Sequence, residues 1–290
     1  MHYWLIANPD AGDGQRDGDF WQSHLQGVGI TGVKRCDLQD QQWVAQVAAE
    51  DVILAAGGDG SVNGAAGLCL ATGATLGVLP SGTANDFARN LGLPDDPAVL
   101  CQLIAAGTTR QLDVARLRDK LLLNVAHVGA GTWPARAAST AAKQWLGRFS
   151  YGVSLLRKML AYRGFRAEIH SESGYLSGRW FSVAIANGAF YGGGNEIPQA
   201  SVSDGHLDII AVHPRSVVRL LVTFVAVRIM RRSPRNQTTL IHIKSPWCRV
   251  HTRTPKTVTA DGEVMGQTPV DIRCQPRSLN VICEQIVTTT

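Results

Sequence analysis

The stretch Leu54-Ala55-Ala56-Gly57-Gly58-Asp59-Gly60-Ser61-Val62-Asn63 joins a short apolar run to a helical pattern through a cluster of glycines. Glycines let a backbone approach a phosphate closely, and a helix N-terminus presents free N–H groups to an anion. We expect Ser61 to cap this helix through its hydroxyl. No Gly-Lys-Ser/Thr follows, and the spacing differs from the dinucleotide fingerprint, so neither motif applies. The stretch predicts a buried strand, an anion-binding turn and a helix.

The residues on either side of this stretch continue the same alternation. Buried strands are expected over residues 3–7, 51–56 and 75–79, and crossover helices over 43–49 and 62–70. Strands that alternate with helices indicate a parallel sheet covered on both faces, and ligands bind beyond the carboxyl ends of its strands. The glycine clusters after Ala7 and after Ala56 follow two such strand ends.

The second half of the chain has a different pattern. A helical stretch over 133–163 is followed by short strand-like runs over 165–170, 180–186, 207–212, 239–243, 248–251, 257–260, 270–274 and 279–281. Such spacing is typical of an antiparallel sandwich or barrel. We expect an α/β domain over residues 1–120 and an all-β, sandwich-like domain over 121–290, and leave open a return of the last residues to the first domain.

Composition limits the class of protein. The chain has 290 residues, of which 45% are hydrophobic and 18% charged, with a formal net charge of +5. These values are ordinary for a globular protein, and a mildly basic chain suits a phosphate-bearing ligand or an anionic membrane surface. No apolar run approaches the roughly 18–20 residues of a membrane span, and no secretory signal is expected. Six cysteines without a CxxC pair make structural zinc and a disulfide framework poor interpretations, so we expect reduced thiols in a cytoplasmic protein.

Five Asp-Gly dipeptides occur, at Asp13, Asp17, Asp59, Asp204 and Asp261. Each is compatible with a tight turn, and for Asp17 we accept that interpretation alone. Asp59 lies inside the glycine cluster, where a carboxylate beside a phosphate needs a reason. That reason is commonly a magnesium ion or a proton to handle. Asp59 is therefore a candidate functional residue.

Several segments, taken in order, resemble the diacylglycerol kinase catalytic-domain family, which includes sphingosine and ceramide kinases and bacterial soluble lipid kinases. The segments are Asn8-Pro9-Asp10-Ala11-Gly12-Asp13-Gly14, Gly57-Gly58-Asp59-Gly60-Ser61-Val62-Asn63, Leu79-Pro80-Ser81-Gly82-Thr83-Ala84-Asn85-Asp86-Phe87-Ala88-Arg89-Asn90-Leu91-Gly92, Ser203-Asp204-Gly205-His206-Leu207-Asp208 and Asp261-Gly262-Glu263. The third segment is the most distinctive. Five motifs in the right order cover most of the chain.

The resemblance implies a fold and a set of site residues. The fold is an α/β nucleotide-binding domain, with the parallel sheet of NAD kinases and phosphofructokinases, followed by a β-sandwich, with ATP in the cleft between them. The implied nucleotide-binding residues are Asn8, Pro9, Asp10, Ala11, Gly12, Gly57, Gly58, Asp59, Gly60, Ser61, Asn63 and Thr83. Glu263 would take the proton from a lipid hydroxyl, and Asp59 is the second implied catalytic residue. A magnesium ion would be held by Asp204 and by the backbone carbonyls of Ser201 and His206, with another arriving with ATP.

Three departures from the family pattern bear on activity. Gly64 stands where the family usually has Glu, and Ser61 replaces Thr but keeps the hydroxyl. The segment Lys34-Arg35-Cys36-Asp37 offers no equivalent of the threonine that often contacts nucleotide after the second strand.

The resulting hypothesis is an ATP-dependent lipid kinase, a phosphotransferase with an alcohol acceptor. It would transfer the γ-phosphate of ATP to a hydroxyl of diacylglycerol, phosphatidylglycerol or a sphingoid base. A carboxylate base and magnesium would assist, since phosphoryl transfer depends on positioning and charge neutralisation. Two alternatives stay open. One is a kinase of a soluble substrate of the NAD or sugar phosphate type, and the other is a catalytically weak or inactive lipid- or nucleotide-binding protein.

Two basic stretches bear on the partner. Residues 215–232 and 145–166 combine Arg or Lys with apolar residues, which is compatible with ordinary packed amphipathic helices or with contact to an anionic bilayer. The membrane interpretation makes the protein peripheral to the inner face of the membrane, with its lipid substrate at that surface. No nucleic-acid-binding module accompanies these stretches, so nucleic acid is not expected as a partner. The oligomeric state is left unassigned.

Overall fold

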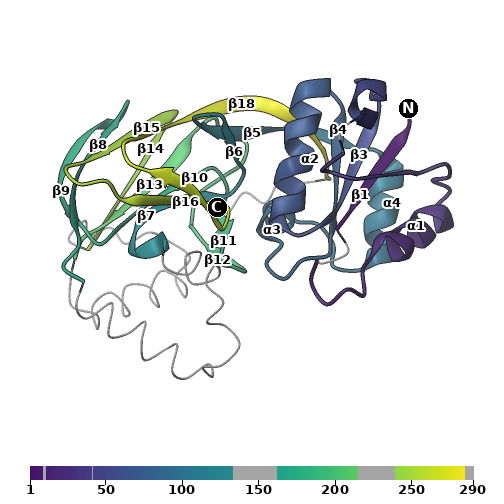
Figure 1. Ribbon diagram of the computed structural model, residues 1–290, viewed down its shortest axis with the longest axis horizontal. Coiled ribbons are helices and arrows are strands. Elements are labelled where there is room, and N and C mark those ends of the chain that lie inside the picture. Colours follow the sequence, from purple (N-terminus) through teal and green to yellow (C-terminus); the bar gives the residue numbers. More distant parts are fainter. Residues whose placement is uncertain (9–10, 41, 133–161, 215–238, 285–290) are drawn as a thin grey trace.

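The computed structural model describes residues 1–8, 11–40, 42–132, 162–214 and 239–284. They form two lobes, an α/β lobe and a β-sandwich lobe (Figure 1). The helical stretches expected over 133–163 and 215–232 lie outside the described residues, apart from Tyr162 and Arg163, which are not in a helix. The fold class expected from the sequence, an α/β domain followed by an all-β sandwich, is confirmed.

The first lobe is built on four parallel strands in the order β2-β1-β3-β4. Their bounds are β2 Lys34–Cys36, β1 Tyr3–Ala7, β3 Val52–Gly57 and β4 Thr75–Pro80. Helix α2 (Asp59–Thr72) covers one face, and α1 (Gly18–Gly27) and α4 (Pro97–Ala106) cover the other (Figure 1). The strand β3 is buried along its whole length, as its unbroken apolar run predicts.

Two local expectations in this lobe are wrong. The segment expected as a helix over 43–49 is a short 3-10 helix, η1 (Gln42–Gln46). The helix ends before Ala48, whose N–H donates to the Asp51 carboxylate at 3.1 Å. Helix α2 begins at Asp59 and its cap is the extended Gly58, which makes no side-chain capping bond. Ser61 lies inside the first turn, with its hydroxyl 3.5 Å from Asn8 Nδ2, so it cannot cap the helix.

The second lobe packs two antiparallel layers against each other. One layer has the order β14-β13-β10-β7-β16-β17, and the other contains β15, β8 and β9. The bounds are β7 Val125–Gly129, β8 Phe165–Ser171, β9 Gly174–Trp180, β10 Ser182–Ala186, β13 Leu207–Val212, β14 Leu240–Ser245, β15 Trp247–Thr252, β16 Thr257–Ala260 and β17 Glu263–Gln267. Their inward side chains alternate with outward ones, and Ile169, Ile185 and Val250 are among those in the shared core.

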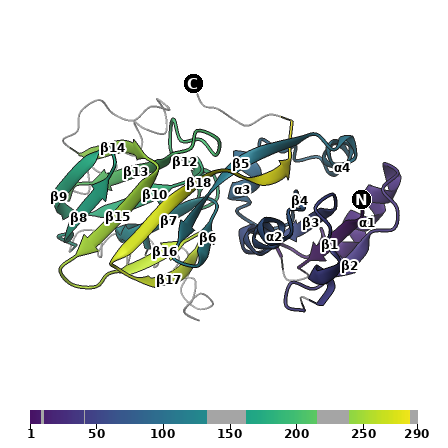
Figure 2. The same ribbon diagram turned by 90° about the horizontal axis from the view of Figure 1, so that it is seen from above.

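One long strand joins the two lobes. Strand β18 (Val270–Ile282) pairs antiparallel with β15 in the sandwich and with β5 (Thr109–Leu117), and its far end pairs parallel with β4 of the first lobe (Figure 2). The two runs expected over 270–274 and 279–281 are therefore a single strand, with a register shift between Gln275 and Leu279. The short β6 (Lys120–Leu122) pairs with β5 beside the junction.

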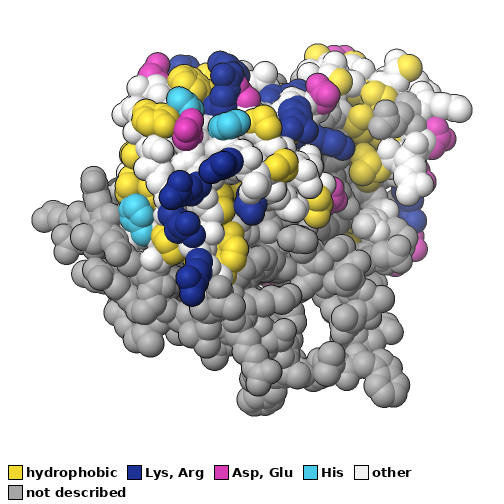
Figure 3. Space-filling view, turned by 60° about the vertical axis from the view of Figure 1, so that its left-hand side comes forward, with side chains coloured by type: hydrophobic (Ala, Val, Ile, Leu, Met, Phe, Trp, Pro, Cys, Tyr) yellow, Lys and Arg dark blue, Asp and Glu magenta, His cyan; other side chains and the backbone are white. Residues whose placement is uncertain are grey.

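Lys and Arg side chains gather on an outer face of the sandwich (Figure 3). The strand registers put five arginines on the same face of this sheet, and we call the side chains of Arg116, Arg166, Arg179, Arg249 and Arg273 the arginine face. Strand pairing sets Arg166 directly opposite Arg179, and Arg273 directly opposite Arg116. Like charges in that relation reduce the stability of a sheet. Asp271, which forms ion pairs with Arg249 and Arg273, and Glu168 lie on the same face, and five arginines against these two carboxylates leave an excess of positive charge.

All six cysteines are free thiols. Within the described ranges, no helix combines the length and the apolar character that a bilayer crossing requires.

Candidate active site

Three loops meet at the carboxyl ends of β1, β3 and β4. Gly12 has φ +65°, and a Cβ at this position would lie 2.2 Å from the carbonyl oxygen of Ser81. A Cβ on Gly82 would lie 2.5 Å from Gly58 Cα. The loops therefore touch through their backbones, which only glycine permits. Asn8 continues β1, since its N–H donates to the carbonyl of Ala56 at 2.9 Å, whereas Pro9 and Asp10 lie outside the described residues.

The predicted phosphate loop is the turn from β3 into α2. Gly57 ends the strand, Gly58 caps the helix, and Asp59, Gly60 and Ser61 form its first turn. The N–H groups of a first helical turn have no partner within the helix, and the helix dipole favours an anion beside them. The sequence-predicted residues of this loop are thus brought together at one helix N-terminus.

The hairpin β16–β17 brings Glu263 to the same point. Asp261 (φ +47°) and Gly262 (φ +85°) form its two-residue turn, and Glu263 is the first residue after it. The Glu263 carboxylate is exposed, and its Oε1 lies 3.9 Å from where a Cβ on Gly60 would be. A carboxylate from the sandwich lobe therefore faces the start of α2 in the α/β lobe.

Asp59 binds the neighbouring helix. Its Oδ1 accepts from the N–H of Phe87 at 2.9 Å and its Oδ2 from the N–H of Asp86 at 3.2 Å, at the start of α3 (Asp86–Asn90). Oδ1 also lies 3.3 Å from Asn124 Nδ2, a donor from the other lobe. The carboxylate of Asp59 thus ties the phosphate loop to α3 and to the sandwich.

Asn124 is a buried link that the sequence analysis missed. Its side-chain oxygen accepts from Asn90 Nδ2 at 2.9 Å, and its amide nitrogen donates to Asp59. Asn90 in turn accepts from the N–H groups of Ala189 and Phe190. The sequence does contain a signal for this link, since Asn124 is the one polar residue in the apolar run 121–126. A buried Asn in such a run needs hydrogen-bond partners.

Asp261 holds the β16–β17 hairpin in place. Its two oxygens accept from the successive backbone N–H groups of Leu123, Asn124 and Val125 at 2.8–3.1 Å, and Asn63 Nδ2 donates to it at 3.0 Å. The carboxylate is enclosed, and burial raises its pKa to about 6 against the lowering effect of the three backbone donors. Asn63 also donates to the carbonyl of Leu121, so its amide nitrogen spans the two lobes.

The distinctive segment after β4 forms the other wall. Thr83 is exposed in the loop, which Asn85 closes by accepting from the N–H of Gly82 and donating to its carbonyl. Asp86 is buried, and its carboxylate accepts from the N–H groups of Gly193 and Gly194 at 3.0–3.1 Å. Burial raises the pKa of Asp86, and these two donors lower it in part.

The three predicted metal ligands do not form an open oxygen site. Asp204 Oδ2 lies 2.5 Å from the ammonium of Lys244, and Oδ1 accepts from the N–H of His206 at 3.1 Å. The hydroxyl of Ser201 lies 3.2 Å from that of Ser203. In the described part of the chain, no three His, Cys, Asp or Glu side chains are grouped to hold a metal. The ammonium of Lys244 thus takes the place at Asp204 that a resident magnesium ion would need, and the metal-binding role of this set stays a prediction.

The departure at Gly64 has a packing reason. A Cβ there would lie 2.6 Å from Leu38 Cδ2, so Leu38 fills the space that a side chain at residue 64 would need. Leu38 packs against the core below α2.

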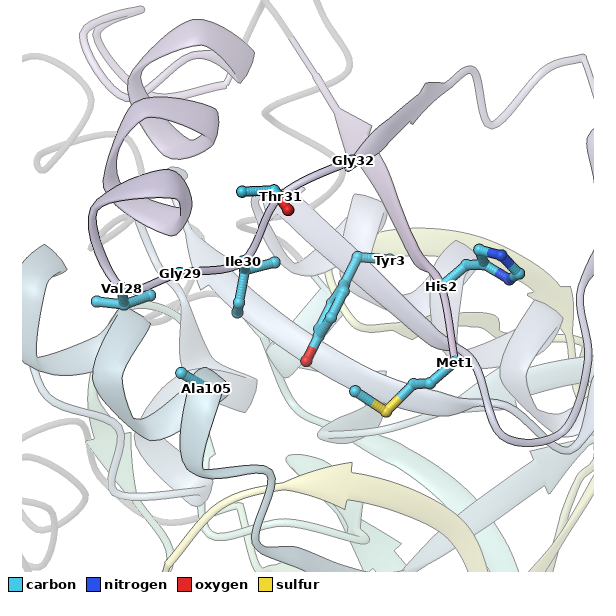
Figure 4. Close-up of a pocket in the computed structure, with 9 residues that line it drawn as sticks. All are labelled: Met1, His2, Tyr3, Val28, Gly29, Ile30, Thr31, Gly32 and Ala105. Carbon is cyan, nitrogen blue, oxygen red and sulfur yellow. The ribbon is translucent and has the colours of Figure 1, made fainter.

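A pocket of about 420 Å³ lies elsewhere in the first lobe (Figure 4). Met1, His2 and Tyr3 line it together with residues 28–32 and Ala105. His2 precedes β1, whereas the three loops of the candidate active site follow the carboxyl ends of the strands. The pocket is therefore at the opposite end of the sheet from that site.

Comparisons with known proteins match both halves of the chain. The model of the diacylglycerol kinase catalytic domain matches residues 2–117, and that of the YegS C-terminal NAD kinase beta sandwich-like domain matches residues 126–283. A protein of Klebsiella pneumoniae named "Probable lipid kinase YegS-like" is 31% identical over 236 residues, which cover 78% of this chain and 77% of that protein. Protein sll0036 of Synechocystis is 31% identical over 303 residues, covering 96% of this chain and 69% of that protein.

The fold is also that of a solved structure from Bacillus anthracis, with a TM-score of 0.76 at 24% identity, covering 98% of this chain and 97% of that one. Since one family model covers the α/β lobe and the other covers the sandwich, the chain belongs to the YegS-like lipid kinases, phosphotransferases built from a diacylglycerol kinase catalytic domain and a β-sandwich-like domain.

Proposed function

We propose that this lipid kinase transfers the γ-phosphate of ATP to the hydroxyl of a lipid of the diacylglycerol, phosphatidylglycerol or sphingoid type. The observation that carries the proposal is the approach of Glu263 to Gly60, because it joins a base from one lobe to a phosphate loop from the other. A carboxylate within reach of an alcohol can take its proton as the oxygen attacks phosphorus.

The nucleotide is proposed to lie over the three glycine-lined loops. Asn8, Ala11 and Gly12 line it, Gly57, Gly58, Gly60 and Ser61 surround its phosphates, and Thr83 contributes its exposed hydroxyl. The proposal is supported by the backbone contacts among these loops and by the N–H groups at the start of α2.

Asp59 and Asn63 are proposed to act through position. Asp59 fixes the start of α3. Asn63 donates a hydrogen bond to the carboxylate of Asp261, which begins the two-residue turn that Glu263 follows. Phosphoryl transfer depends on alignment, so these bonds between lobes bear on the rate even without contact to the reacting atoms.

Magnesium is proposed to enter as the ATP complex, that is, as part of the substrate. Its charge would neutralise the phosphates during transfer. The step assigned to this chain's own residues is the removal of the hydroxyl proton by Glu263, and no step is assigned to the Ser201, Asp204 and His206 set.

The lipid is proposed to be met at an anionic membrane surface. This is supported by the arginine face, whose like-charged pairs Arg166–Arg179 and Arg273–Arg116 would be relieved by anionic headgroups (Figure 3). Burying a protein face of net positive charge against anionic lipid is favourable at moderate ionic strength.

Transfer of radiolabel from ATP into mixed micelles tests the function. We expect label in at least one of diacylglycerol, phosphatidylglycerol or a sphingoid base, and none in NAD or a sugar phosphate. The variant Glu263→Gln should reduce turnover by about 100-fold or more while binding ATP normally, since a general base contributes roughly 10²- to 10⁴-fold. Glu172→Gln, which changes an exposed glutamate in the turn between β8 and β9, is the matched control and should keep full activity.

Three other outcomes would count against the proposal. Binding of ATP and lipid without transfer would support the non-catalytic alternative, and label in a soluble acceptor would support the soluble-substrate alternative. Wild-type turnover in Glu263→Gln would remove the general base from the proposal.

A further inference from the structure

The segment 199–208, which leads from β12 (Asn195–Glu196) into β13, places three oxygen atoms around one ammonium group. Lys244 Nζ donates to the carbonyl of Gln199 at 2.7 Å and to Asp204 Oδ2 at 2.5 Å. It also lies 3.7 Å from Asp208 Oδ2. Three oxygens from two parts of the chain therefore surround the end of one lysine side chain from β14.

Asp208 needs this charge. Its side chain is fully buried, and although Oδ1 is 2.6 Å from His242 Nε2, Oδ2 has no hydrogen-bond partner among the described residues. A buried carboxylate oxygen without a counter-charge is strongly unfavourable. Strand pairing sets Lys244 directly opposite Asp208, so the register of β13 and β14 places the ammonium beside this carboxylate.

We infer that the ammonium of Lys244 is the resident cation of this segment, in the place where the family resemblance implies a magnesium ion. Two observations support this inference. Lys244 supplies a positive charge to both Asp204 and Asp208, and both oxygens of Asp204 already have partners, Lys244 Nζ and the N–H of His206. A magnesium ion requires about six oxygen ligands at 2.0–2.1 Å in an octahedral arrangement. To reach the oxygen of Asp204, it would have to displace the ammonium of Lys244. Two cations sharing one carboxylate oxygen would repel each other.

The segment that Lys244 holds is docked on the junction of the lobes. The N–H of Gly205 donates to Asp113 Oδ2 at 2.6 Å, and the N–H of Arg277 donates to Asp113 Oδ1 at 2.7 Å. The N–H of Asp113 donates to the carbonyl of Val202 at 2.7 Å. Asp113 belongs to β5 and Arg277 to β18, the strands that connect the two lobes. The 199–208 segment is therefore tied to both connecting strands through the hydrogen bonds of Asp113.

Thermal unfolding of the nucleotide-free protein tests the inference, with calorimetric titration of magnesium and calcium beside it. The melting temperature of the wild type should be the same in excess EDTA and in millimolar MgCl2 or CaCl2, with no heat of ion binding. Lys244→Met should melt at least about 5 °C lower in EDTA, because it leaves Asp204 and Asp208 without a cation. Either divalent ion should restore much of that loss by entering the vacated oxygens. Lys34→Met, which removes a lysine above the Trp4 ring in the first lobe, should respond to neither ion.

These unfolding and ion-binding experiments contain no nucleotide or lipid, so their outcome does not depend on whether the protein is an active kinase. Stoichiometric magnesium binding by the wild type, abolished in Asp204→Asn, would overturn the inference, and this measurement decides even if Lys244→Met does not fold. A Lys244→Met protein that melts like the wild type, or one that no divalent ion stabilises, would make Lys244 an ordinary ion-pair residue and would also overturn it.

Discussion

The carboxylate of Asp261 combines enclosure with four hydrogen-bond donors, three from successive backbone N–H groups and one from Asn63. Enclosure penalises the charged form, and the donors favour it. Enclosure has the larger effect, so the pKa rises from 3.8 to about 6. The folded state consequently binds a proton more tightly than the unfolded state between these two values.

This difference predicts a pH dependence of stability. Between about pH 4 and pH 6 the unfolded chain has released the proton of Asp261 and the folded chain keeps it, so stability falls as the pH rises through this window. Relative to Asp261→Asn, the free energy of unfolding of the wild type should fall by about 2–3 kcal/mol across the window and stay level above it. Urea unfolding at several pH values measures this difference. Asp119→Asn, at an exposed turn, should show no such window, and a pH-independent difference for Asp261→Asn would contradict the raised pKa.

At the scale of elements, the site depends on two loops that touch through glycine. Residue 82 has no room for a Cβ, because Gly58 Cα would lie 2.5 Å away and is backbone. The loop after β4 and the cap of α2 would have to move apart to accept one.

Gly82→Ala should therefore weaken ATP binding by about ten-fold or more and lower stability by about 1–3 kcal/mol, the usual effect of overpacking. Gly67→Ala on α2, the helix whose cap Gly82 touches, is the matched control, since a Cβ there meets nothing within 4 Å. It should leave ATP binding unchanged and add up to about 1 kcal/mol of stability, because alanine favours a helix over glycine. Titration calorimetry with ATP and denaturant unfolding measure both effects. Equal ATP affinity in the two variants would show that the close approach of the loops is not needed for nucleotide binding.

At the scale of the whole molecule, the arginine face gives one side of the sandwich a positive charge, while Glu263, the proposed base, lies on the hairpin that meets the other lobe. The proposed membrane-binding face and the proposed ATP site are therefore separate surfaces, and the two proposals can be tested separately.

Arg166→Glu/Arg179→Glu should weaken binding to phosphatidylglycerol vesicles by about ten-fold or more, because each basic side chain near an anionic surface contributes about 1 kcal/mol. Lys34→Glu/Arg35→Glu makes the same change of charge on β2 of the first lobe and should have little effect. Vesicle sedimentation at low and moderate salt measures the difference, which should shrink as salt rises. Equal loss in both variants would mean that net charge alone drives adsorption, without a defined face.

The sequence alone predicts the local geometry of this protein well. The run 54–63 indicates a strand, a glycine turn and a helix because its signals act over a few residues, and the strand over 3–7 was predicted with its observed bounds. It also predicts the hairpin turn at Asp261 and Gly262, since that dipeptide favours two consecutive positive φ values. The resemblance adds that Glu263 and the Gly57–Asn63 segment share one site.

Local signals do not specify which atoms the polar side chains bind. Asp59 binds Phe87 and Asn124, and Asp204 binds Lys244, partners that are 28, 65 and 40 residues away along the chain. The Asp59–Asn124 contact needs β18 to join the two lobes, whereas the Asp204–Lys244 contact needs the register of β13 and β14 within the sandwich. Short-range backbone preferences therefore determined the elements and the glycine turns, whereas the tertiary structure decided the links between the lobes and the cation of the 199–208 segment, because buried charges are satisfied by whichever groups the packing of distant strands brings within reach.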